Sequence, residues 1–472
     1  MPTQNGILVS SSCFTPSQER AFEALLSGKN IFLTGEAGTG KSYILNKFID
    51  YVTNSNKSCI VCAPTGIAAI NVKGATIHRT FAAPIGPILN GPKQSTDIVR
   101  QADIIIIDEI SMCRSDLFDF VAKSIRNAEE STGKRKQIVV IGDFFQLAPV
   151  VKDDIDVLKT LEGFKEGFAF QSKYWESFHF KMIIMIDIVR QSGDALFAEH
   201  LNRLRKGDKS AIDWINKNAT STPSSGIHLC ATNKEAEKIN NRELDKLDGS
   251  ERTYIAKESG EVTESDRATS RELTLKEHAR IMMLINDPEE RYQNGSLGTI
   301  DKLGTNYINI HLDNGKEISV ERHKWEIERY TIVTNANNEK TLEKEVVGTF
   351  SQFPIKVAYA ITIHKSQGQT FDSINLHPAC FTVGQLYVAL SRVKSIAGLH
   401  LVSSIKEKHL LTSKSVFEFY EAQESTQALR PRGGKRTGAG RKSKYNTKTI
   451  TMRVPACLEA EIKAWIDQKM AQ

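Results

Sequence analysis

The sequence predicts an α/β protein with two doubly wound domains, a small β-barrel inserted into the second, and a basic C-terminal tail. Three observations indicate this organisation. Apolar runs that end at Gly, Pro or an acidic residue alternate with helical stretches in two parts of the chain. A more polar segment interrupts the second part, and basic residues cluster near the C-terminus. The chain has 472 residues, a length suited to two to four domains.

The apolar runs predict parallel strands. Fully apolar strands are typical of a parallel sheet that helices cover on both faces, and ligands of such sheets bind at the carboxyl ends of the strands. The first series, in a domain predicted over 1–185, is Asn30–Gly35, Ser58–Pro64, Asp103–Glu109 and Gln137–Asp143. The second series, in a domain predicted over 186–428, is Gly226–Asn233, Val357–Lys365 and Gly398–Ser404.

The segment from about 272 to 353 has a different character. Its short runs alternate apolar and polar residues, with many charges and turn signals. Within it, two period-2 runs flank the pair Asn314-Gly315, a pattern that predicts a β-hairpin. We therefore expect a small β-barrel inserted into the second α/β domain.

Composition excludes several classes of protein. The longest apolar stretches, Ile104–Ile107 and Ile281–Ile285, are far shorter than the ~18 residues that a membrane span needs. The N-terminus has no basic residue before Arg20, unlike a transit peptide or secretory signal. The seven scattered cysteines favour a reducing compartment. We expect a cytoplasmic protein, nucleoid-associated in a prokaryote or encoded by a phage, with no membrane partner.

Cys59 and Cys62 form one C-x-x-C pair that has two interpretations. The pair could be half of a zinc site, but no second pair completes it. It lies in a strand-like run, so two buried thiols in a core strand are the favoured interpretation.

A phosphate-binding loop is the first motif that carries chemistry. GEAGTGKS, from Gly35 to Ser42, follows an apolar run and opens a helical stretch, as that motif requires. Its backbone N–H groups can surround phosphate oxygens, while Lys41 reaches the β- and γ-phosphates and Ser42 binds Mg²⁺. The predicted nucleotide-binding residues of the loop are Gly35, Ala37, Gly38, Thr39, Gly40, Lys41 and Ser42.

Two further strand ends complete the predicted ATPase centre. Asp108 ends an apolar strand and can hold the magnesium ion, and Glu109 beside it can polarise an attacking water. A third strand leads into GDFFQLAPV and brings Gln146 to the same edge of the sheet, where its amide could sense the γ-phosphate.

Here the sequence resembles a known family. The phosphate loop, DEISM at Asp108–Met112 and GDFFQLAPV resemble the ATPase motifs of superfamily 1 helicases, in particular the Pif/RecD-like branch. ITIHKSQGQTFD (Ile361–Asp372) and QLYVALSRVKS (Gln385–Ser395) are similar to later motifs of that branch. The resemblance spans about 14–404 and implies two RecA-like domains, ATP and Mg²⁺ as cofactors, and 5′→3′ movement on single-stranded DNA.

The resemblance also implies roles for single residues. Gln18 would recognise adenine. Arg190 and Arg392 would reach the γ-phosphate from the second domain as arginine fingers, and Gly368 would lie nearby. The residues implied to contact DNA are Pro64, Thr65, His78, Phe81, Thr362, His364 and Lys365. A wedge or pin element is expected near 82–96, without a clear strand-splitting residue.

The C-terminal region lies outside this resemblance. From Arg430 to Lys448 there are eight basic residues and no acidic one, whereas the whole chain has a net charge of 62 − 56 = +6. This basic Gly-rich linker, assigned to 429–448, either adds affinity for nucleic acid or is a disordered solubilising extension. Residues 449–472 weakly resemble half of a ribbon-helix-helix module, which would allow dimers of an otherwise monomeric motor.

The motifs predict an ATP-dependent DNA helicase that acts on single-stranded, forked and 5′-tailed duplex DNA. Two alternatives use the same motor residues. One is a translocase that moves along DNA without unwinding it. The other is a nucleotide-switched loading factor, whose ATPase would respond to DNA without directional movement.

Overall fold

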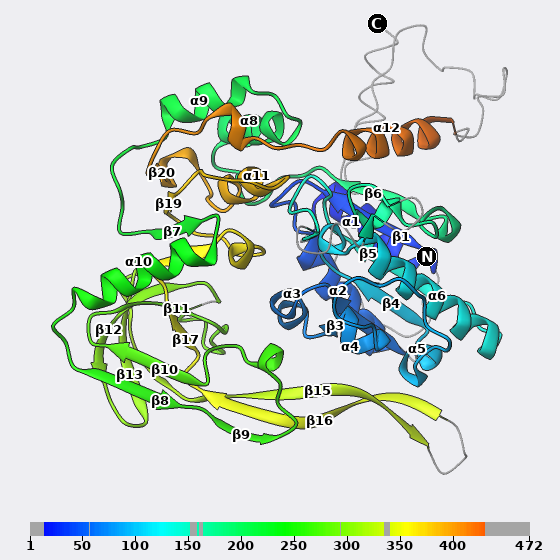
Figure 1. Ribbon diagram of the computed structural model, residues 1–472, viewed down its shortest axis with the longest axis horizontal. Helices are drawn as coiled ribbons and strands as arrows, with labels where there is room; N and C mark the ends of the chain where they lie inside the picture. The colour runs from blue at the N-terminus through cyan, green and yellow to red at the C-terminus, as the bar shows by residue number, and fades with distance from the viewer. Residues whose placement is uncertain are drawn as a thin grey trace, which may run out of the picture. The chain divides into compact units, whose positions relative to one another are not determined.

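A computed structural model of the chain describes residues 14–55, 57–151, 158–159, 164–292, 294–334 and 340–429. Its described residues up to Tyr420 belong to one compact unit, and helix α12 (Lys414–Leu429) continues beyond that point. The fold combines parallel α/β sheets with antiparallel sheets, as the sequence predicts (Figure 1). The basic linker and the ribbon-helix-helix-like segment lie outside the described residues and stay predictions.

The first parallel sheet has six strands in the order β3-β2-β4-β5-β1-β6. Alternate residues along each strand face opposite sides: Ile105 and Ile107 belong to one apolar core, and Ile104 and Ile106 to another. Both faces are therefore buried, which explains the unbroken apolar runs. The strands are β1 (Ile31–Gly35), β2 (Cys59–Ala63), β3 (Ala75–Thr76), β4 (Ile104–Ile107), β5 (Gln137–Ile141) and β6 (Lys181–Met185).

Helices cover both faces of this sheet. On one side, α1 (Pro16–Leu26) and α2 (Lys41–Thr53) pack their apolar residues against the strands. On the other side, α4 (Ile77–Phe81), α6 (Ser115–Thr132) and the start of α12 do the same. The remaining helices of this region are α3 (Gly66–Asn71) and α5 (Asp97–Gln101). Strands β3 and β6 were not among the predicted strands, because β3 is very short and β6 carries an exposed lysine.

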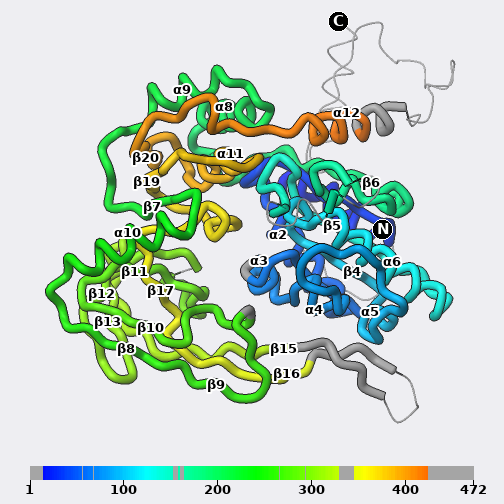
Figure 2. Tube along the Cα trace, viewed as in Figure 1, coloured from blue at the N-terminus to red at the C-terminus, as the bar shows by residue number. Residues whose placement is uncertain are grey.

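A second parallel sheet has four strands in the order β18-β7-β19-β20. Strands that are distant in the sequence lie side by side here, and Figure 2 shows green β7 next to β19 and β20 in the colours of the late chain. The strands are β7 (Ile227–Cys230), β18 (Ala360–Thr362), β19 (Ile374–Leu376) and β20 (Leu399–Leu401). Helices α8 (Ala195–Arg205), α9 (Ser210–Asn218) and α11 (Gln385–Leu390) share one apolar core with the sheet, and α10 (Asn233–Asp245) contributes to another.

Antiparallel strands occupy the chain between α10 and β18. A five-stranded sheet and the pair β8–β10 face one common apolar core, and the predicted hairpin around Asn314-Gly315 is confirmed as β13–β14. A third sheet contains the long hairpin β15–β16, which the sequence did not predict. The strands are β8 (Glu251–Ile255), β9 (Lys257–Gly260), β10 (Glu272–Lys276), β11 (Arg280–Met283), β12 (Leu297–Leu303), β13 (Tyr307–Leu312), β14 (Glu317–Glu321), β15 (His323–Thr334), β16 (Lys340–Gln352) and β17 (Ile355–Val357).

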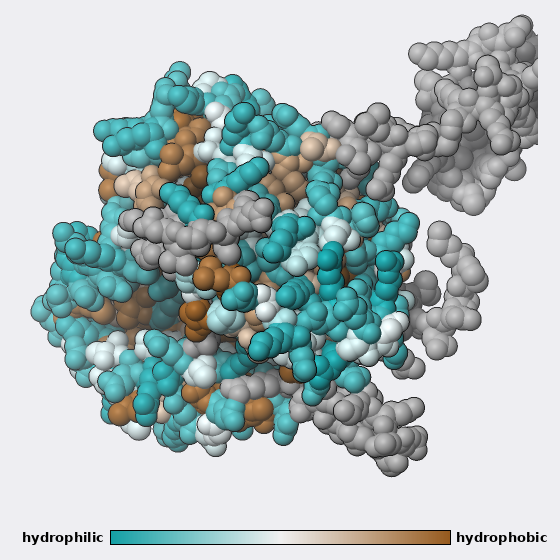
Figure 3. Space-filling view, turned by 45° about the vertical axis from the view of Figure 1, so that its right-hand side comes forward, coloured by the Kyte–Doolittle hydropathy of each residue, from teal (hydrophilic) through white to brown (hydrophobic). Residues whose placement is uncertain are grey.

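The face in Figure 3 is mainly hydrophilic, with apolar residues gathered in small areas. Among the described helices, none combines the length and apolarity needed to cross a bilayer. Cys59 and Cys62 lie in β2 and form no disulfide, and burial raises the pKa of the Cys62 thiol.

Candidate functional site

The phosphate loop connects β1 to α2. Gly38 and Gly40 have φ angles of +84° and +86°, a backbone conformation that favours glycine. The Lys41 ammonium donates to the carbonyl oxygens of Gly35 at 2.8 Å and Glu36 at 3.0 Å, which holds it against the loop. Burial lowers the pKa of Lys41, an effect that the Asp143 and Glu109 carboxylates oppose. The loop therefore offers a cation and backbone donors together, as a triphosphate requires.

Two acidic residues follow β4 and lie next to the loop. Burial raises the pKa of Asp108 to about 6. Burial first, and the charge of Asp108 second, raise the pKa of Glu109 to about 7. Glu109 also has a φ of +50°, a left-handed conformation that costs energy in a residue with a side chain. Glu109 thus combines a strained backbone with a carboxylate whose pKa suits it to accept a proton near neutral pH.

Residues from the second parallel sheet reach the same place. The Gln367 amide donates to a Glu109 carboxylate oxygen at 2.8 Å. The backbone N–H of Ala37 donates to the Tyr387 hydroxyl at 2.9 Å, so helix α11 touches the phosphate loop directly. Neither Gln367 nor Tyr387 was predicted as a site residue, although both lie inside the quoted motifs.

The two predicted arginine fingers are close together and held by backbone carbonyls. Arg190 donates to the Ser391 carbonyl at 3.0 Å. Arg392 is 2% exposed and donates to the carbonyls of Val388 at 2.8 Å and Ser366 at 3.3 Å. Burial, together with the nearby Arg190 charge, lowers the pKa of Arg392 to about 9. An anion between these guanidinium groups would relieve both the burial cost and their mutual repulsion.

One cavity of about 170 Å³ joins these groups. Phosphate-loop residues, both carboxylates after β4 and both arginines line it together. Tyr43 and Gly142 also line the cavity. The predicted residues that line it are Ala37, Gly38, Gly40, Lys41, Ser42, Asp108, Glu109, Gln146, Arg190, Gly368 and Arg392. The hydroxyl of Ser42 and the carboxylates of Asp108 and Glu109 are hard oxygen donors of the kind that Mg²⁺ prefers.

Three predicted nucleotide-binding residues are not among the lining residues of that cavity. Two of them, Gly35 and Thr39, belong to the loop itself, and the fully buried Thr39 donates its hydroxyl hydrogen to the Glu36 carbonyl at 2.9 Å. Gln18 is 4% exposed, and its amide nitrogen donates to the Thr39 carbonyl at 3.1 Å. Its amide oxygen accepts from the backbone N–H of Thr15 at 3.1 Å, which caps helix α1. In this structure Gln18 supports the loop, and its role toward adenine stays a prediction.

A buried ion pair that the sequence did not predict lies beside the cavity. Arg205, on α8, makes two hydrogen bonds to the Asp143 carboxylate after β5, at 2.9 and 3.2 Å. The Asp143 side chain is fully buried, and the Arg205 guanidinium also stacks over the Phe145 ring at 4.2 Å. Asp143 lies in a quoted motif, but nothing in the sequence around Arg205 indicates its partner.

The residues predicted to contact DNA lie at the ends of β2 and β18 and in α4. The Thr65 hydroxyl accepts from the Ala68 N–H at 3.3 Å and caps α3, and the Thr362 hydroxyl accepts from the Lys365 N–H at 3.3 Å. Burial lowers the pKa of His364. The pKa of His78 falls as well, through burial and the nearby Arg114 charge. Both histidines are therefore neutral hydrogen-bonding groups at pH 7.

The structure places one residue predicted to contact DNA inside a core. Phe81 is 1% exposed and packs inside the core that supports the first sheet. Its ring cannot stack on a base without leaving that core, so the apolar residue that the motif contains serves packing.

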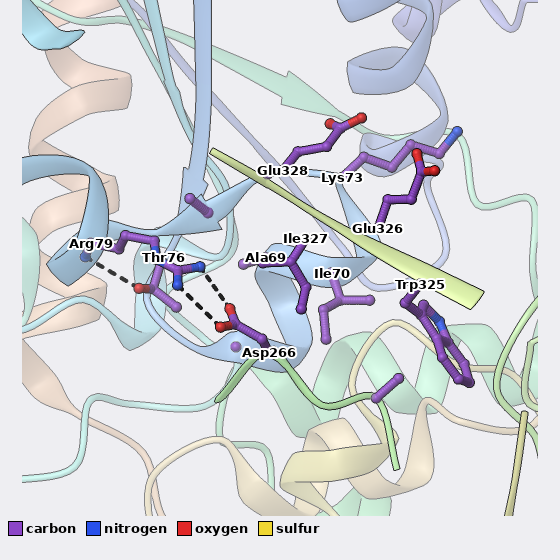
Figure 4. A pocket seen from close by; sticks show the side chains of 14 residues that line it. Ala69, Ile70, Lys73, Thr76, Arg79, Asp266, Trp325, Glu326, Ile327 and Glu328 are labelled. Carbon is purple, nitrogen blue, oxygen red and sulfur yellow. Dashed lines mark hydrogen bonds and ion pairs between the residues drawn. The ribbon is translucent and has the colours of Figure 1, made fainter. Parts of the chain in front are cut away.

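A second cavity, of about 300 Å³, lies next to α4. Figure 4 shows Arg79, from α4, and Asp266, from the 3₁₀ helix η6 (Glu264–Asp266), pointing toward one another. Their two hydrogen bonds measure 2.6 and 3.1 Å. Trp325 and Ile327 of β15 line the same cavity. The pair joins residues nearly two hundred positions apart, which no local sequence pattern indicates.

The region expected to hold a wedge, 82–96, contains no strand and is anchored at its base. The Ile88 N–H donates to the buried Asp116 carboxylate at 2.8 Å, and the Arg114 guanidinium pairs with that same carboxylate. Ile85 is 94% exposed on this anchored loop. The sequence could not distinguish Ile85 from Ile88, because both lie in the same run of proline, glycine and apolar residues.

Comparisons with known proteins agree with these findings. A model of the PIF1-like helicase family matches residues 13–220. The ATP-dependent DNA helicase Pif1 of Bdellovibrio bacteriovorus is 30% identical over 429 residues, covering 86% of this chain and 91% of that protein. A structure of Bacteroides sp Pif1 in complex with ADP-AlF4 is 33% identical, with a TM-score of 0.75 over 87% of this chain and 97% of that one. Bacteroides Pif1 bound to ssDNA is 34% identical, with a TM-score of 0.62 over 88% and 97%.

Proposed function

The chain belongs to the PIF1-like helicase family, and on that premise we propose that it is an ATP-dependent DNA helicase that moves 5′→3′ on single-stranded DNA. The observation that carries this proposal is the single cavity that joins the phosphate loop, Glu109 and the two arginines. Such a cavity matches the needs of phosphoryl transfer, in which positioning and charge stabilisation supply most of the catalysis. A relative crystallised with ADP-AlF4 supports ATP as the nucleotide.

The predicted catalytic and metal-binding residues that line the cavity each have a role in this proposal. Lys41 and the loop N–H groups bind the β- and γ-phosphates, while Ser42 and Asp108 hold Mg²⁺. Glu109 accepts a proton from the attacking water, and Gln146 senses the γ-phosphate. Magnesium supplies charge neutralisation when it is bound. Arg190 and Arg392 stabilise negative charge that develops on the γ-phosphate, a contribution of about 10³–10⁵ in rate for arginine fingers.

The contacts between the two parallel sheets support a motor. Gln367 touches the proposed base, and Tyr387 touches the phosphate loop. Both come from the motifs that also carry Thr362 and Arg392. A change in nucleotide state would therefore alter contacts of the second sheet directly. Because the proposed DNA contacts lie on both sheets, that change would move one set relative to the other.

We assign DNA binding to the ends of β2 and β18 and to α4. The proposed contacts are Pro64, Thr65, His78, Thr362, His364 and Lys365, without Phe81. The proposed substrates are single-stranded DNA and forked or 5′-tailed duplexes, and a relative crystallised with ssDNA supports the first. Ile85 is the proposed apolar tip that separates the strands, since it is the most exposed large apolar residue among those described.

The finer architecture belongs to the same proposal. The two parallel sheets would be RecA-like domains over 1–185 and 186–428, and the antiparallel strands a small barrel inserted in the second. We propose a monomeric motor in the cytoplasm, associated with the nucleoid in a bacterium, with dimers only through the C-terminal tail.

The decisive experiment compares ATP hydrolysis with and without single-stranded DNA in magnesium buffer. DNA should stimulate hydrolysis strongly, and Lys41→Ala should lower the stimulated rate by about 10²–10³-fold, as loss of one charge-stabilising donor does. Lys47→Ala is the matched control, because Lys47 lies on the same helix outside the cavity.

Strand separation then distinguishes a helicase from the alternatives. Unwinding of a 5′-tailed duplex, but not of a 3′-tailed one, supports the proposal. DNA-stimulated hydrolysis with movement but no unwinding would indicate a translocase instead. An equal rate of ATP hydrolysis with and without DNA would contradict the proposal of a DNA-driven motor.

A further inference from the structure

A group of metal-ligating side chains lies outside the ATP cavity, at the carboxyl end of β7. Cys230 ends that strand, Glu235 lies in the first turn of α10, and His377 directly follows β19. Their ligating atoms all lie within 4.8 Å of one another. Among the residues that the structure describes, no other group of Cys, His, Asp and Glu meets this criterion.

The orientation of His377 suits a metal ligand. Its Nδ1 lies 3.2 Å from a Glu235 carboxylate oxygen, and its Nε2 lies 3.0 Å from Nδ1 of His228. A metal-bound histidine almost always donates its second ring N–H to a neighbouring acceptor, which fixes the ring. His228 can be that acceptor. With the proton on Nε2, the Nδ1 lone pair of His377 points at the carboxylate and the thiol.

Burial and access are also suitable. Cys230 is fully buried, whereas the side chains of His377 and Glu235 are 18% and 36% exposed. An ion could therefore reach the group from solvent past the carboxylate. Cys380 lies three residues after His377. Cys380 is 5% exposed, and its thiol is not one of the ligating atoms that lie within 4.8 Å of one another, so a shift of its side chain would be needed for it to bind the same ion.

We propose that Cys230, Glu235 and His377 bind one Zn²⁺ ion, with Cys380 or a water molecule as the fourth ligand. One thiol, one imidazole and one carboxylate form a donor set that Zn²⁺ accepts in tetrahedral geometry, whereas Mg²⁺ and Ca²⁺ require oxygen ligands. As the Zn–S bond forms, the Cys230 thiol gives its proton to solvent. The inference is independent of the ATP cavity and goes beyond helicase activity.

The bound ion would stiffen the edge that carries proposed motor residues. Cys230 pairs with Thr362 across the sheet, and the Ile363 N–H donates to the Cys230 carbonyl at 2.9 Å. The Gln385 amide, at the start of α11, donates to the Ala231 carbonyl at 3.2 Å. Zinc would thus link β7, α10 and the loop after β19. Residues 230 and 231 of this linked group contact the segment that carries Thr362 and the start of α11. Its role is structural.

The test uses the full chain, purified without a polyhistidine tag, stripped with a chelator and titrated with Zn²⁺ or Co²⁺ in excess Mg²⁺. We expect one ion per chain, a cobalt spectrum with thiolate charge transfer and four-coordinate d–d bands, and a Tm that rises with Zn²⁺ concentration. Cys230→Ser and His377→Ala should lose the ion. Cys113→Ser, a buried cysteine outside the group, should keep it.

Two further variants sharpen the result. His228→Ala should weaken zinc binding by about 10- to 100-fold, as loss of an orienting partner does. Cys380→Ser should remove part of the thiolate charge-transfer band if Cys380 is the fourth ligand and leave it intact if water is. Should Cys230→Ser fail to fold, Glu235→Gln tests the same site at a more exposed position. A wild-type chain that takes up neither ion, or uptake that survives Cys230→Ser and His377→Ala, overturns the proposal in favour of a hydrogen-bonded histidine chain.

Discussion

Glu109 shows how the environment of a single residue prepares it for chemistry. Its carboxylate is desolvated, lies beside Asp108 and accepts one hydrogen bond from Gln367. Its backbone occupies a left-handed conformation that a glycine would adopt without strain. Burial and the charge of Asp108 raise the pKa of the side chain, and the left-handed backbone costs stability. The fold retains them because they aim a proton acceptor into the cavity.

The raised pKa of Glu109 predicts a pH-dependent stability difference. In the folded chain Glu109 keeps its proton up to about pH 7, whereas in the unfolded chain it loses it near 4.5. The native state therefore binds more protons in that window, and the free energy of unfolding falls as pH rises through it. Glu109→Gln lacks this titrating group. The Tm of the variant relative to that of the wild type should therefore increase as pH rises from about 4.5 to 7.

The same substitution separates stability from catalysis. Glu109→Gln should lower DNA-stimulated ATP hydrolysis by about 10²–10⁴-fold, the usual contribution of a general base. Parallel stability curves for the two proteins across that pH range would contradict the assigned pKa.

At the scale of elements, a few long side chains join the second sheet and its helices to the first. Arg205 reaches from α8 to the end of β5, and Tyr387 reaches from α11 to the phosphate loop. Both contacts are buried, so little water screens them. A buried pair that loses one member leaves an uncompensated charge, which is more damaging than loss of an exposed pair.

Two arginines on α8 allow a matched test of this point. Arg205→Met leaves the buried Asp143 carboxylate without its partner and should lower the free energy of unfolding by about 3–5 kcal/mol. Arg203 pairs with Asp208 on the surface, and Arg203→Met should leave the free energy of unfolding nearly unchanged. Urea denaturation of both variants measures the two free energies of unfolding. Equal losses would show that burial does not make the Arg205–Asp143 pair more important for stability than the exposed pair.

At the scale of the whole molecule, the proposed mechanism assigns hydrolysis and strand separation to different residues. The ATP cavity lies between the two parallel sheets, while the loop that carries Ile85 is anchored through Asp116 to α6. In the part of the chain that the structure describes, no hydrogen bond joins that loop to the phosphate loop. The two activities should therefore be separable by substitution.

Ile85→Ser tests this separation. Because Ile85 is 94% exposed, the substitution should leave folding and DNA-stimulated ATP hydrolysis unchanged. Duplex unwinding should fall by about tenfold or more, since an apolar side chain that enters a base step offsets the cost of unstacking. Val150→Ser, an exposed apolar residue elsewhere, is the control. Equal unwinding by Ile85→Ser and the wild type would remove Ile85 from the proposed mechanism.

Much of the site was predictable because its chemistry is encoded in contiguous residues. A phosphate loop needs glycines, a lysine and a serine in fixed order, and strand-end acids follow recognisable apolar runs. For the same reason most strands of both parallel sheets and the hairpin at Asn314-Gly315 were predicted, although β3, β6 and β19 were not, and most residues that line the cavity had been named as site residues. The differences have physical causes as well: Phe81 is apolar and packs in the core, β3 and β19 are only two and three residues long, and β6 is an edge strand of its sheet.

From the sequence alone followed the α/β class, the family resemblance and most of the residues that line the cavity, because each depends on local order along the chain. The folded structure shows which distant residues become partners: Arg205 with Asp143, Gln367 with Glu109, and Cys230 with His377. The members of each pair are more than sixty residues apart and meet only in the folded chain. Their chemistry depends on distance and burial, which no local pattern of residues encodes.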